Sequence, residues 1–295
     1  MKLLDGKALS QQFINEVKEE ALSLDGTPHL AVVQVGDDPA SSVYIRHKER
    51  ACKRAEFQFT HIKLSIKTTT EQLIQTVEQL NSSPTITGYI VQVPLPPHID
   101  LPQIISHIDP YKDVDCFHPE NVGLMAKGYP RYYPATPYGV IKLLRRYNIE
   151  TKGKWVTIVG KSDIVGKPLQ LMLSNEFKYA ATTISCDRYT HNLKELTKIA
   201  DILIVAAGVP NLIPDQTWIK PNAVVVDVGI NRVGTTKDGK AILKGDVNFD
   251  EIKEHCSYIT PVPGGVGPMT VATLIYNVML SLHIANNKSY QSKLA

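Results

Sequence analysis

The chain has 295 residues, enough for two domains of ordinary size, and with 43% hydrophobic and 21% charged residues it has the composition of a globular protein rather than a disordered or fibrous one. The formal net charge of +3 is too small and too dispersed to indicate a nucleic-acid partner. The four cysteines lie far apart with no Cys-x-x-Cys pair, so neither a zinc site nor a disulfide framework is indicated, and we expect no bound metal.

Helical and strand patterns alternate through the first half of the chain. Apolar residues at helical spacing and runs of β-branched residues predict helices over 9–21, 39–55 and 69–80, and strands over 29–36, 60–64 and 88–93. The last of these strands is almost wholly apolar, as expected inside a parallel sheet. It runs into Pro94-Leu-Pro-Pro97, which ends the ladder because proline brings no N–H.

The second half begins after a segment rich in proline and tyrosine, 130–139, which marks the expected domain boundary. The patterns predict a helix over 138–147, strands over 155–159, 182–186, 202–206, 223–228 and 258–260, a surface excursion over 231–245, a final helix over 269–285 and a frayed tail over 286–295. Strands that alternate with helices in this way predict a doubly wound parallel sheet, and the whole chain is therefore expected to be an α/β protein.

The stretch from Trp155 to Leu173 is the most informative part of the sequence. It predicts a buried strand, a tight glycine loop from Gly160 to Gly166, and a helix that opens at Pro168. Such an order suits a dinucleotide pyrophosphate, because the helix N-terminus offers unpaired N–H groups and a positive dipole end. The loop is neither Gly-x-Gly-x-x-Gly nor a nucleoside-triphosphate loop, so the strand and helix that flank it carry the prediction.

Three polar side chains fall near carboxyl ends of the strands predicted in the first half. Tyr44 and Lys48 share a helix face at a spacing of four residues, and Gln92 lies at the end of a strand in the same sheet. Ligands of open α/β sheets bind at that edge. A surface phenol with a solvated lysine is the alternative for an arbitrary Tyr-x-x-x-Lys pair.

Two loop segments could serve a ligand or only the fold. Asp113 and Asp115, in Lys-Asp-Val-Asp, are either ligand groups or turn caps. The segment 261–270 holds three glycines and three prolines, so its backbone could approach a ligand closely, or it could act as a stiff hinge.

Seven motifs stand in one order along the chain: Val91-Gln-Val-Pro-Leu-Pro96, Lys112-Asp-Val-Asp115, Thr136-Pro-x-Gly139, Ile164-Val-Gly-Lys-Pro168, Asp227-x-Gly-Ile-Asn231, Gly245-Asp-Val247 and Pro261-Val-Pro-Gly-Gly-Val-Gly-Pro-Met-Thr270. In these the chain resembles the bifunctional methylenetetrahydrofolate dehydrogenase/methenyltetrahydrofolate cyclohydrolase family, over about residues 1 to 285. The resemblance implies a folate-binding catalytic domain and a Rossmann-type domain with a cleft between them. It also implies an enzyme of one-carbon metabolism and purine biosynthesis that makes 10-formyltetrahydrofolate.

The resemblance also implies a role for individual residues. Lys48 would be the essential catalytic group beside Gln92, Tyr44 would flank the folate ring, and Asp115 would hydrogen-bond the pterin edge. The backbone of Pro263, Gly264 and Gly265 would line the same folate site. The residues implied to bind the cofactor are Gly160, Lys161, Ser162, Ile164, Val165, Asp187, Arg188 and Ile230.

The chain departs from the family pattern at four places. Cys116 stands where glycine is common, Ala135 where cysteine is common, and Lys161 where arginine is usual. The fourth is Cys186-Asp-Arg188, where Cys-His-Ser is usual and where the adenosine ribose would lie. Asp187 would favour a free 2′-hydroxyl and Arg188 a 2′-phosphate. Because Lys161 is expected to lie nearby as a second cation, we expect NADP, with NAD possible.

The predicted domains are residues 1–137 with 270–295, which bind folate, and residues 138–269, which bind the dinucleotide. No apolar run approaches the roughly 18 residues that span a bilayer, and the N-terminus lacks a signal-peptide pattern, so we expect a cytoplasmic protein with no membrane partner. The resemblance suggests a homodimer. Another two-domain NAD(P)-dependent dehydrogenase and a non-catalytic dinucleotide sensor are the rival interpretations.

Overall fold

The computed structural model describes residues 1–175, 178–236, 239 and 241–286, and it divides into two compact units. We call the one formed by residues 11–135 and 271 onward the three-stranded unit, and the one formed by residues 1–10 and 136–270 the six-stranded unit. Each unit is a parallel sheet with helices, so the predicted α/β class is confirmed. The prediction placed residues 1–10 in the folate domain, whereas the structure groups them with the six-stranded unit.

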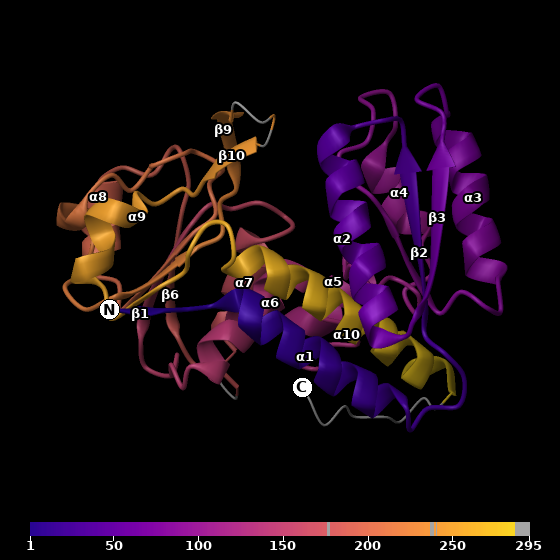
Figure 1. Cartoon of the computed structure of the whole chain (residues 1–295), viewed down its shortest axis with the longest axis horizontal. Coiled ribbons are helices and arrows are strands. Elements are labelled where there is room, and N and C mark those ends of the chain that lie inside the picture. The colour runs from indigo at the N-terminus through magenta and orange to yellow at the C-terminus, as the bar shows by residue number, and fades with distance from the viewer. Residues whose placement is uncertain (176–177, 237–238, 240, 287–295) are drawn as a thin grey trace. The chain divides into compact units, whose positions relative to one another are not determined.

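The three-stranded unit has the strand order β3-β2-β4, and all three strands run parallel. Its elements are α1 (Gly6–Ala21, whose first residues belong to the other unit), β2 (His29–Val35), α2 (Pro39–Ala55), β3 (Gln58–Leu64), α3 (Thr70–Ser82), β4 (Gly88–Val91), α4 (Leu101–His107) and α5 (Pro119–Ala126). Apolar side chains of β2, β4, α3 and α4 pack together as one buried core. Helix α2 lies against β2 and β3 (Figure 1).

Helix boundaries in this unit follow from capping chemistry. The Asp38 carboxylate accepts a hydrogen bond from the Ser41 N–H at 2.7 Å, and Pro39 takes the first position of α2. The helix ends at Glu56, which adopts the left-handed conformation with φ 61°. Helix α3 opens with a capping box between Thr69 and Gln72. These local signals explain why helices were predictable here from the sequence.

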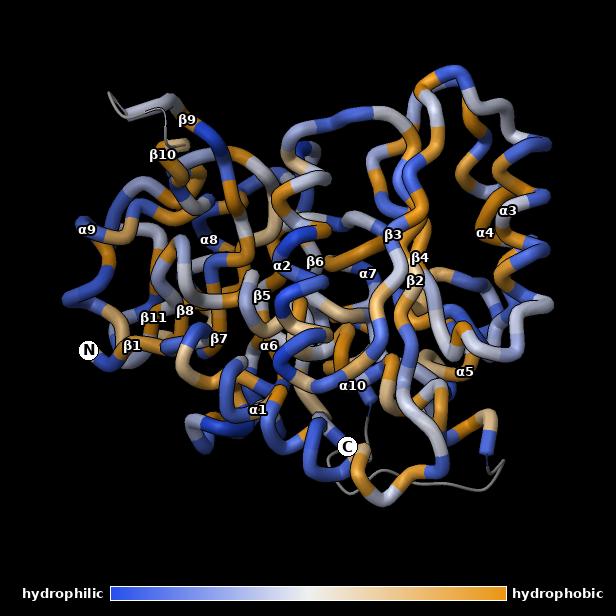
Figure 2. The backbone as a smooth tube through the Cα atoms, turned by 45° about the vertical axis from the view of Figure 1, so that its right-hand side comes forward, coloured by the Kyte–Doolittle hydropathy of each residue, from blue (hydrophilic) through white to orange (hydrophobic). Residues whose placement is uncertain are grey.

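The six-stranded unit has the strand order β1-β11-β8-β7-β5-β6, again all parallel. Its elements are β1 (Lys2–Leu3), α6 (Ala135–Arg146), β5 (Trp155–Val159), α7 (Gly166–Leu173), β6 (Thr182–Cys186), α8 (Leu193–Lys198), β7 (Ile202–Val205), β8 (Val224–Asp227), β9 (Asn231–Thr235), β10 (Ala241–Lys244), α9 (Phe249–Ile252), β11 (Tyr258–Ile259) and α10 (Val266–Asn286), which continues into the other unit. Figure 2 shows the strands of this sheet as largely hydrophobic, as burial on both faces requires.

Several boundaries differ from the prediction. Helix α7 begins at Gly166 rather than Pro168, and α6 begins at Ala135 rather than at Tyr138. The segment predicted as a surface excursion contains an antiparallel pair of strands, β9 and β10. The short β1 was not predicted, and it pairs with β11. Of the predicted frayed tail, residues 287–295 lie outside the described residues.

Among the described residues, α10 is the one helix that is long and apolar enough to cross a membrane by length and composition alone. However, 72% of its most apolar 18-residue stretch is buried inside the protein, as expected of a core helix. Within it, the fully buried Asn277 donates to the carbonyl oxygens of Val114 at 2.8 Å and Tyr133 at 2.7 Å. This one amide therefore ties two loops of the three-stranded unit to the helix.

We expect Asn277→Ala to destabilise the protein, because both carbonyl oxygens would lose a buried partner. At about 1–3 kcal/mol for each buried group left unpaired, the free energy of unfolding should fall by about 2–4 kcal/mol. Urea denaturation followed by circular dichroism measures this change, with Gln75→Ala on the exposed face of α3 as the control. Equal stability of the two variants would contradict a structural role for Asn277.

Candidate functional site

Helix α2 presents Tyr44 and Lys48 one turn apart, just after the carboxyl end of β2. Tyr44 is 42% exposed, so its ring is available to a ligand. Burial of part of the ring raises the pKa of the phenol above its ordinary value, so Tyr44 stays protonated at neutral pH. Tyr44 can therefore act as a flat apolar surface with a hydroxyl donor.

The Lys48 Nζ donates a hydrogen bond to the Gln92 Oε1 at 2.7 Å. Gln92 follows β4 directly, and its Nε2 donates to the Val93 carbonyl oxygen at 2.6 Å. The carbonyl of Val93 can only accept, so the amide nitrogen of Gln92 must face it and the amide oxygen must face Lys48. The orientation of Gln92 is thus set by chemistry, and its oxygen holds the lysine amine in one place.

Lys48 and Asp115 affect each other's protonation. Burial lowers the pKa of Lys48, while the charge of Asp115 acts in the opposite direction. Burial raises the pKa of Asp115 to about 6, although the charge of Lys48 opposes that shift. The lysine can therefore lose a proton more easily than a solvated lysine, and the carboxyl group titrates close to neutrality.

The loop that carries Asp115 is fixed by hydrogen bonds to two backbone carbonyls just before this residue. The Tyr89 N–H donates to the Lys112 carbonyl oxygen at 3.0 Å, and the Asn277 side chain holds the Val114 carbonyl. The next residue, Cys116, has a φ of 62°, which is the left-handed conformation that favours glycine. That backbone angle explains why glycine suits this position and why cysteine there is a departure.

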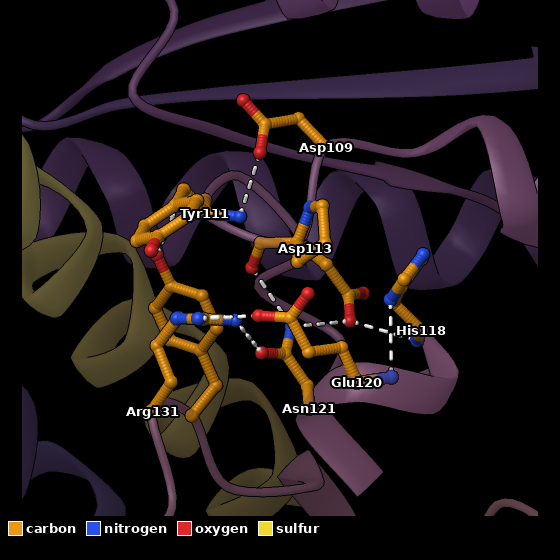
Figure 3. A network of polar contacts seen from close by, with 9 residues as sticks. Asp109, Tyr111, Asp113, His118, Glu120, Asn121 and Arg131 are labelled. Carbon is orange, nitrogen blue, oxygen red and sulfur yellow. Dashed lines mark hydrogen bonds and ion pairs between the residues drawn. The ribbon is translucent and has the colours of Figure 1, made fainter. Parts of the chain in front are cut away.

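Asp113, the other aspartate of the loop, lies in a network of hydrogen bonds that fixes the loop (Figure 3). It is 1% exposed and accepts hydrogen bonds from the His118 N–H at 2.8 Å, the Phe117 N–H at 3.2 Å and the Asn121 side chain at 2.8 Å. Arg131 in turn donates to the Asn121 Oδ1 at 2.6 Å. Three donors on one carboxylate match the turn-cap interpretation for Asp113, and this network supports the loop beneath Asp115.

The glycine loop of the six-stranded unit follows β5, where the strand order reverses because β6 lies on one side of β5 and β7 on the other. Gly160 has a φ of 120°, and a Cβ there would lie 2.2 Å from the Ala206 carbonyl oxygen. A Cβ on Gly166 would lie 1.9 Å from the Gly160 oxygen. Both positions need glycine because the backbone folds tightly on itself at the topological switch point, where dinucleotides bind.

Helix α7 starts from this loop without a side-chain cap at its N-cap residue, Val165. The Ser162 hydroxyl accepts from the Val165 N–H at 3.2 Å, which shapes the turn before the helix. Ile164 is 46% exposed beside it. In the first turn of α7, Pro168 has no N–H and the Lys167 N–H donates to the Ser162 carbonyl oxygen at 3.1 Å. The turn therefore offers a pyrophosphate the Gly166 N–H and the positive end of the helix dipole.

Of the three charged residues predicted near the ribose, two contact each other. Lys161 Nζ lies 3.1 Å from the Asp187 Oδ2, so these two side chains form an ion pair. The hydrogen bond from Lys161 lowers the pKa of Asp187. The Arg188 guanidinium lies 4.9 Å from the ring centre of Tyr189. Of the two predicted cations, Lys161 is partly neutralised by Asp187, whereas Arg188 is bound to no carboxylate in the described part of the chain.

The remaining predicted residues also lie in the six-stranded unit. Ile230 is 39% exposed after β8. The Gly264 carbonyl oxygen accepts from the Lys7 N–H at 2.8 Å, and the Gly265 N–H donates to the Pro261 carbonyl oxygen at 2.8 Å. Lys48, Gln92 and Asp115 belong to the three-stranded unit. The structure thus brings the lysine, glutamine and aspartate together within the three-stranded unit, and Pro263 to Gly265 form a tightly folded segment of the six-stranded unit.

A cavity of about 290 Å³ lies in the six-stranded unit at the carboxyl ends of β8 and β11, lined by Asp227, Lys244, Phe249 and Thr260 among others. None of the predicted site residues lines it. In the residues that the structure describes, no group of three histidine, cysteine or acidic side chains gathers as a metal site.

Comparison with known proteins identifies both parts of the chain. The family model "Tetrahydrofolate dehydrogenase/cyclohydrolase, catalytic domain" matches residues 4–115, and the model of the family's NAD(P)-binding domain matches residues 134–286. The bifunctional protein FolD of Wolinella succinogenes is 48% identical over 284 residues, covering 95% of this chain and 96% of the relative.

Solved structures agree with this assignment. The FolD methylenetetrahydrofolate dehydrogenase/cyclohydrolase of Campylobacter jejuni superimposes with a TM-score of 0.89 at 42% identity, covering 97% of this chain and 99% of that one. The enzyme of Trypanosoma brucei, solved with NADP cofactor and an inhibitor, has a TM-score of 0.89 at 35% identity, over 95% of this chain and 97% of that one. The resemblance, the enzyme class and the two-domain fold predicted from the motifs are confirmed, and this chain belongs to the tetrahydrofolate dehydrogenase/cyclohydrolase family.

Proposed function

We propose that this chain oxidises 5,10-methylenetetrahydrofolate to 5,10-methenyltetrahydrofolate with NADP and then hydrolyses that product to 10-formyltetrahydrofolate. Membership of the family over both domains supports the pair of reactions. The observation that carries the chemistry is the hydrogen bond between Lys48 and Gln92, because it holds a lysine of lowered pKa at the ligand-binding edge of a sheet.

The six-stranded unit fits the proposed dinucleotide. The loop between Gly160 and Gly166 is so tightly folded that a Cβ on either glycine would collide with the backbone, and it leads into α7 at the topological switch point. The positive end of the helix dipole and the Gly166 N–H can hold the pyrophosphate there. Lys161, Asp187 and Arg188 follow at the ends of β5 and β6, where the ribose of a Rossmann-bound dinucleotide lies. When bound, the nicotinamide supplies the hydride acceptor for the oxidation.

For the oxidation, the residues of this chain provide position rather than acid or base. Tyr44 offers a flat ring against the folate, and Asp115 offers a carboxylate to the amidine-like donors of the pterin edge. The carboxylate suits this task because, in the described part of the chain, it accepts no hydrogen bond from the protein. Pro263, Gly264 and Gly265 remain proposed substrate contacts on the resemblance alone.

For the hydrolysis, Lys48 moves a proton. Water attacks the methenyl carbon and gives up one proton to the neutral Lys48 amine, so that a carbinolamine forms. The bond from this carbon to N5 then breaks as the formyl carbonyl forms, one proton ends on N5, and one is released to solvent. A lysine whose pKa is lowered by burial accepts and returns this proton more readily than a solvated lysine, while Gln92 fixes its position.

A cytoplasmic location and a homodimeric state complete the proposal. Both are supported by the family resemblance alone, and the oligomeric state can be read directly by light scattering. The rival of a non-catalytic dinucleotide sensor is disfavoured because the residues proposed for catalysis are all present.

Replacing Lys48 should reduce the hydrolysis without unfolding the protein. We expect Lys48→Met to reduce the hydrolysis of methenyltetrahydrofolate by about a hundredfold or more, the usual loss when a general acid or base is removed. The loss of methenyl absorbance measures this rate. Lys53→Met, at an exposed position of the same helix, is the control and should keep full activity. If the Lys48 variant hydrolysed its substrate at the wild-type rate, the assignment of Lys48 would be wrong.

The protonation of Asp115 should appear in the pH dependence of the dehydrogenase step, which needs no base. The carboxylate is ionised above its pKa of about 6 and binds the pterin only in that form. We therefore expect kcat/KM for the oxidation to fall by about tenfold per pH unit below this pKa. Asp115→Asn should lower kcat/KM at neutral pH and remove this dependence, whereas Asp25→Asn should change neither. A wild-type profile that stayed flat down to pH 5 would contradict the proposal.

The preference for NADP over NAD should depend on Arg188, because Lys161 already forms an ion pair with Asp187. Arg188→Ala should lower kcat/KM for NADP by about fivefold to tenfold, the worth of one exposed charge pair, and leave the NAD value nearly unchanged. Asp187→Ser should free Lys161 and sharpen the preference for NADP. Steady-state assays with each cofactor measure both effects, and Arg145→Ala is the control. A wild-type enzyme with a higher kcat/KM for NAD than for NADP would show that the assignment of NADP is wrong.

A further inference from the structure

Two of the motifs singled out in the sequence interlock in the structure through buried carboxylates. Asp227, the last residue of β8, is 3% exposed. Its Oδ1 accepts from the N–H groups of Gly229 and Asp246, both at 3.0 Å, and its Oδ2 accepts from the Val247 N–H at 2.9 Å. One side chain thus joins the segment after β8 to the segment after β10.

The side chain of Asp246 makes a second set of contacts, to segments that follow other strands. It is fully buried, and its Oδ2 accepts from the N–H groups of Ala207 at 2.6 Å and Gly208 at 2.9 Å. Its Oδ1 accepts from the Asn231 Nδ2 at 2.8 Å. The residues held in this way follow β7 and β8, so Asp246 crosslinks two loops at the carboxyl edge of the sheet.

The glycines of both motifs are needed because the carboxylates lie against the backbone. A Cβ on Gly245 would lie 1.8 Å from the Asp227 Oδ2, and a Cβ on Gly229 would lie 2.1 Å from the Asp246 Oδ1. Neither glycine has a positive φ, so close approach rather than backbone conformation excludes other residues there. The motifs are therefore one interdependent arrangement of two acids and two glycines.

The arrangement reaches the proposed cofactor site through the segment after β7. Gly160 of the glycine loop lies so close to this segment that a Cβ on it would be 2.2 Å from the Ala206 oxygen and 3.3 Å from the Ala207 nitrogen. Asp246 holds the N–H of that same Ala207. The backbone on which the glycine loop rests is thus restrained by a carboxylate that need not touch the cofactor.

We infer that Asp246, supported by Asp227, is a positioning residue that orders the loops after β7 and β8 for dinucleotide binding. The inference rests on the proposed function, since it takes NADP as the ligand at this edge. The two activities should respond differently to a change at Asp246, because oxidation needs the dinucleotide, whereas hydrolysis of methenyltetrahydrofolate does not. Loss of the positioning contact should therefore weaken NADP binding and spare the hydrolysis.

The test is Asp246→Asn, which keeps the size of the side chain but turns one oxygen that accepts N–H bonds into a donor. We expect the Kd for NADP, measured by calorimetry on the whole protein, to rise at least tenfold. In the same preparation, kcat/KM for hydrolysis of methenyltetrahydrofolate without cofactor should stay within twofold of wild type. Asp250→Asn, which changes a carboxylate that is 82% exposed nearby, is the matched control and should alter neither value.

Hydrogen exchange of the cofactor-free protein gives a second readout. The amides of Ala207 and Gly208 should exchange faster in Asp246→Asn than in wild type, while amides of β2 should be unchanged. If that variant does not fold, Asn231→Ala removes only one of the three hydrogen bonds and should show a smaller change at the same amides.

Wild-type NADP affinity in a folded Asp246→Asn, or equal loss of both activities, would overturn the inference. A wild-type protein that neither bound NADP nor hydrolysed methenyltetrahydrofolate would instead refute the proposed function.

Discussion

The hydrogen bond between the Lys48 amine and the Gln92 amide oxygen is the contact on which the chemistry of this protein depends. A lysine in water has a pKa of about 10.4 and is almost fully protonated at neutral pH, so it cannot serve as a base there. Burial lowers the pKa of Lys48, and the parallel sheet makes that burial possible because α2 and the end of β4 meet at one edge. Asp115 limits the shift, since its negative charge favours the protonated amine.

Four aspartates of the two units fall into two groups according to how many hydrogen bonds each carboxylate accepts from the protein. Asp113, Asp227 and Asp246 are buried and each accept three hydrogen bonds, so their role is to fix loops. Asp115 accepts none in the part of the chain that the structure describes, so its carboxylate is free for a ligand. Both units thus use buried acids to hold irregular backbone, and in the six-stranded unit that backbone lies at the carboxyl edge of the parallel sheet, which is where α/β proteins bind their ligands.

Local signals made much of the fold predictable. Helix α2 was predicted with the bounds Pro39–Ala55, and its start is encoded locally, because Asp38 caps the helix and Pro39 takes its first position. The two-residue β1 has no periodicity to detect, and its pairing with β11 joins opposite ends of the chain. In the site, the spacing of Tyr44 and Lys48 was readable from the sequence. The ion pair of Lys161 with Asp187 was not, since it depends on the angle between two loops. The assignments of catalytic and binding residues stay predictions.

The pKa of Lys48 tests the account most directly. Protein carrying ¹³C at the lysine Cε can be titrated by nuclear magnetic resonance, and Lys48→Met identifies the signal. The account predicts that this lysine titrates at clearly lower pH than the exposed lysines, and that its pKa falls further in Asp115→Asn, because the opposing charge is gone. Titration of Lys48 together with the exposed lysines would contradict the claim that the fold prepares a lysine for proton transfer.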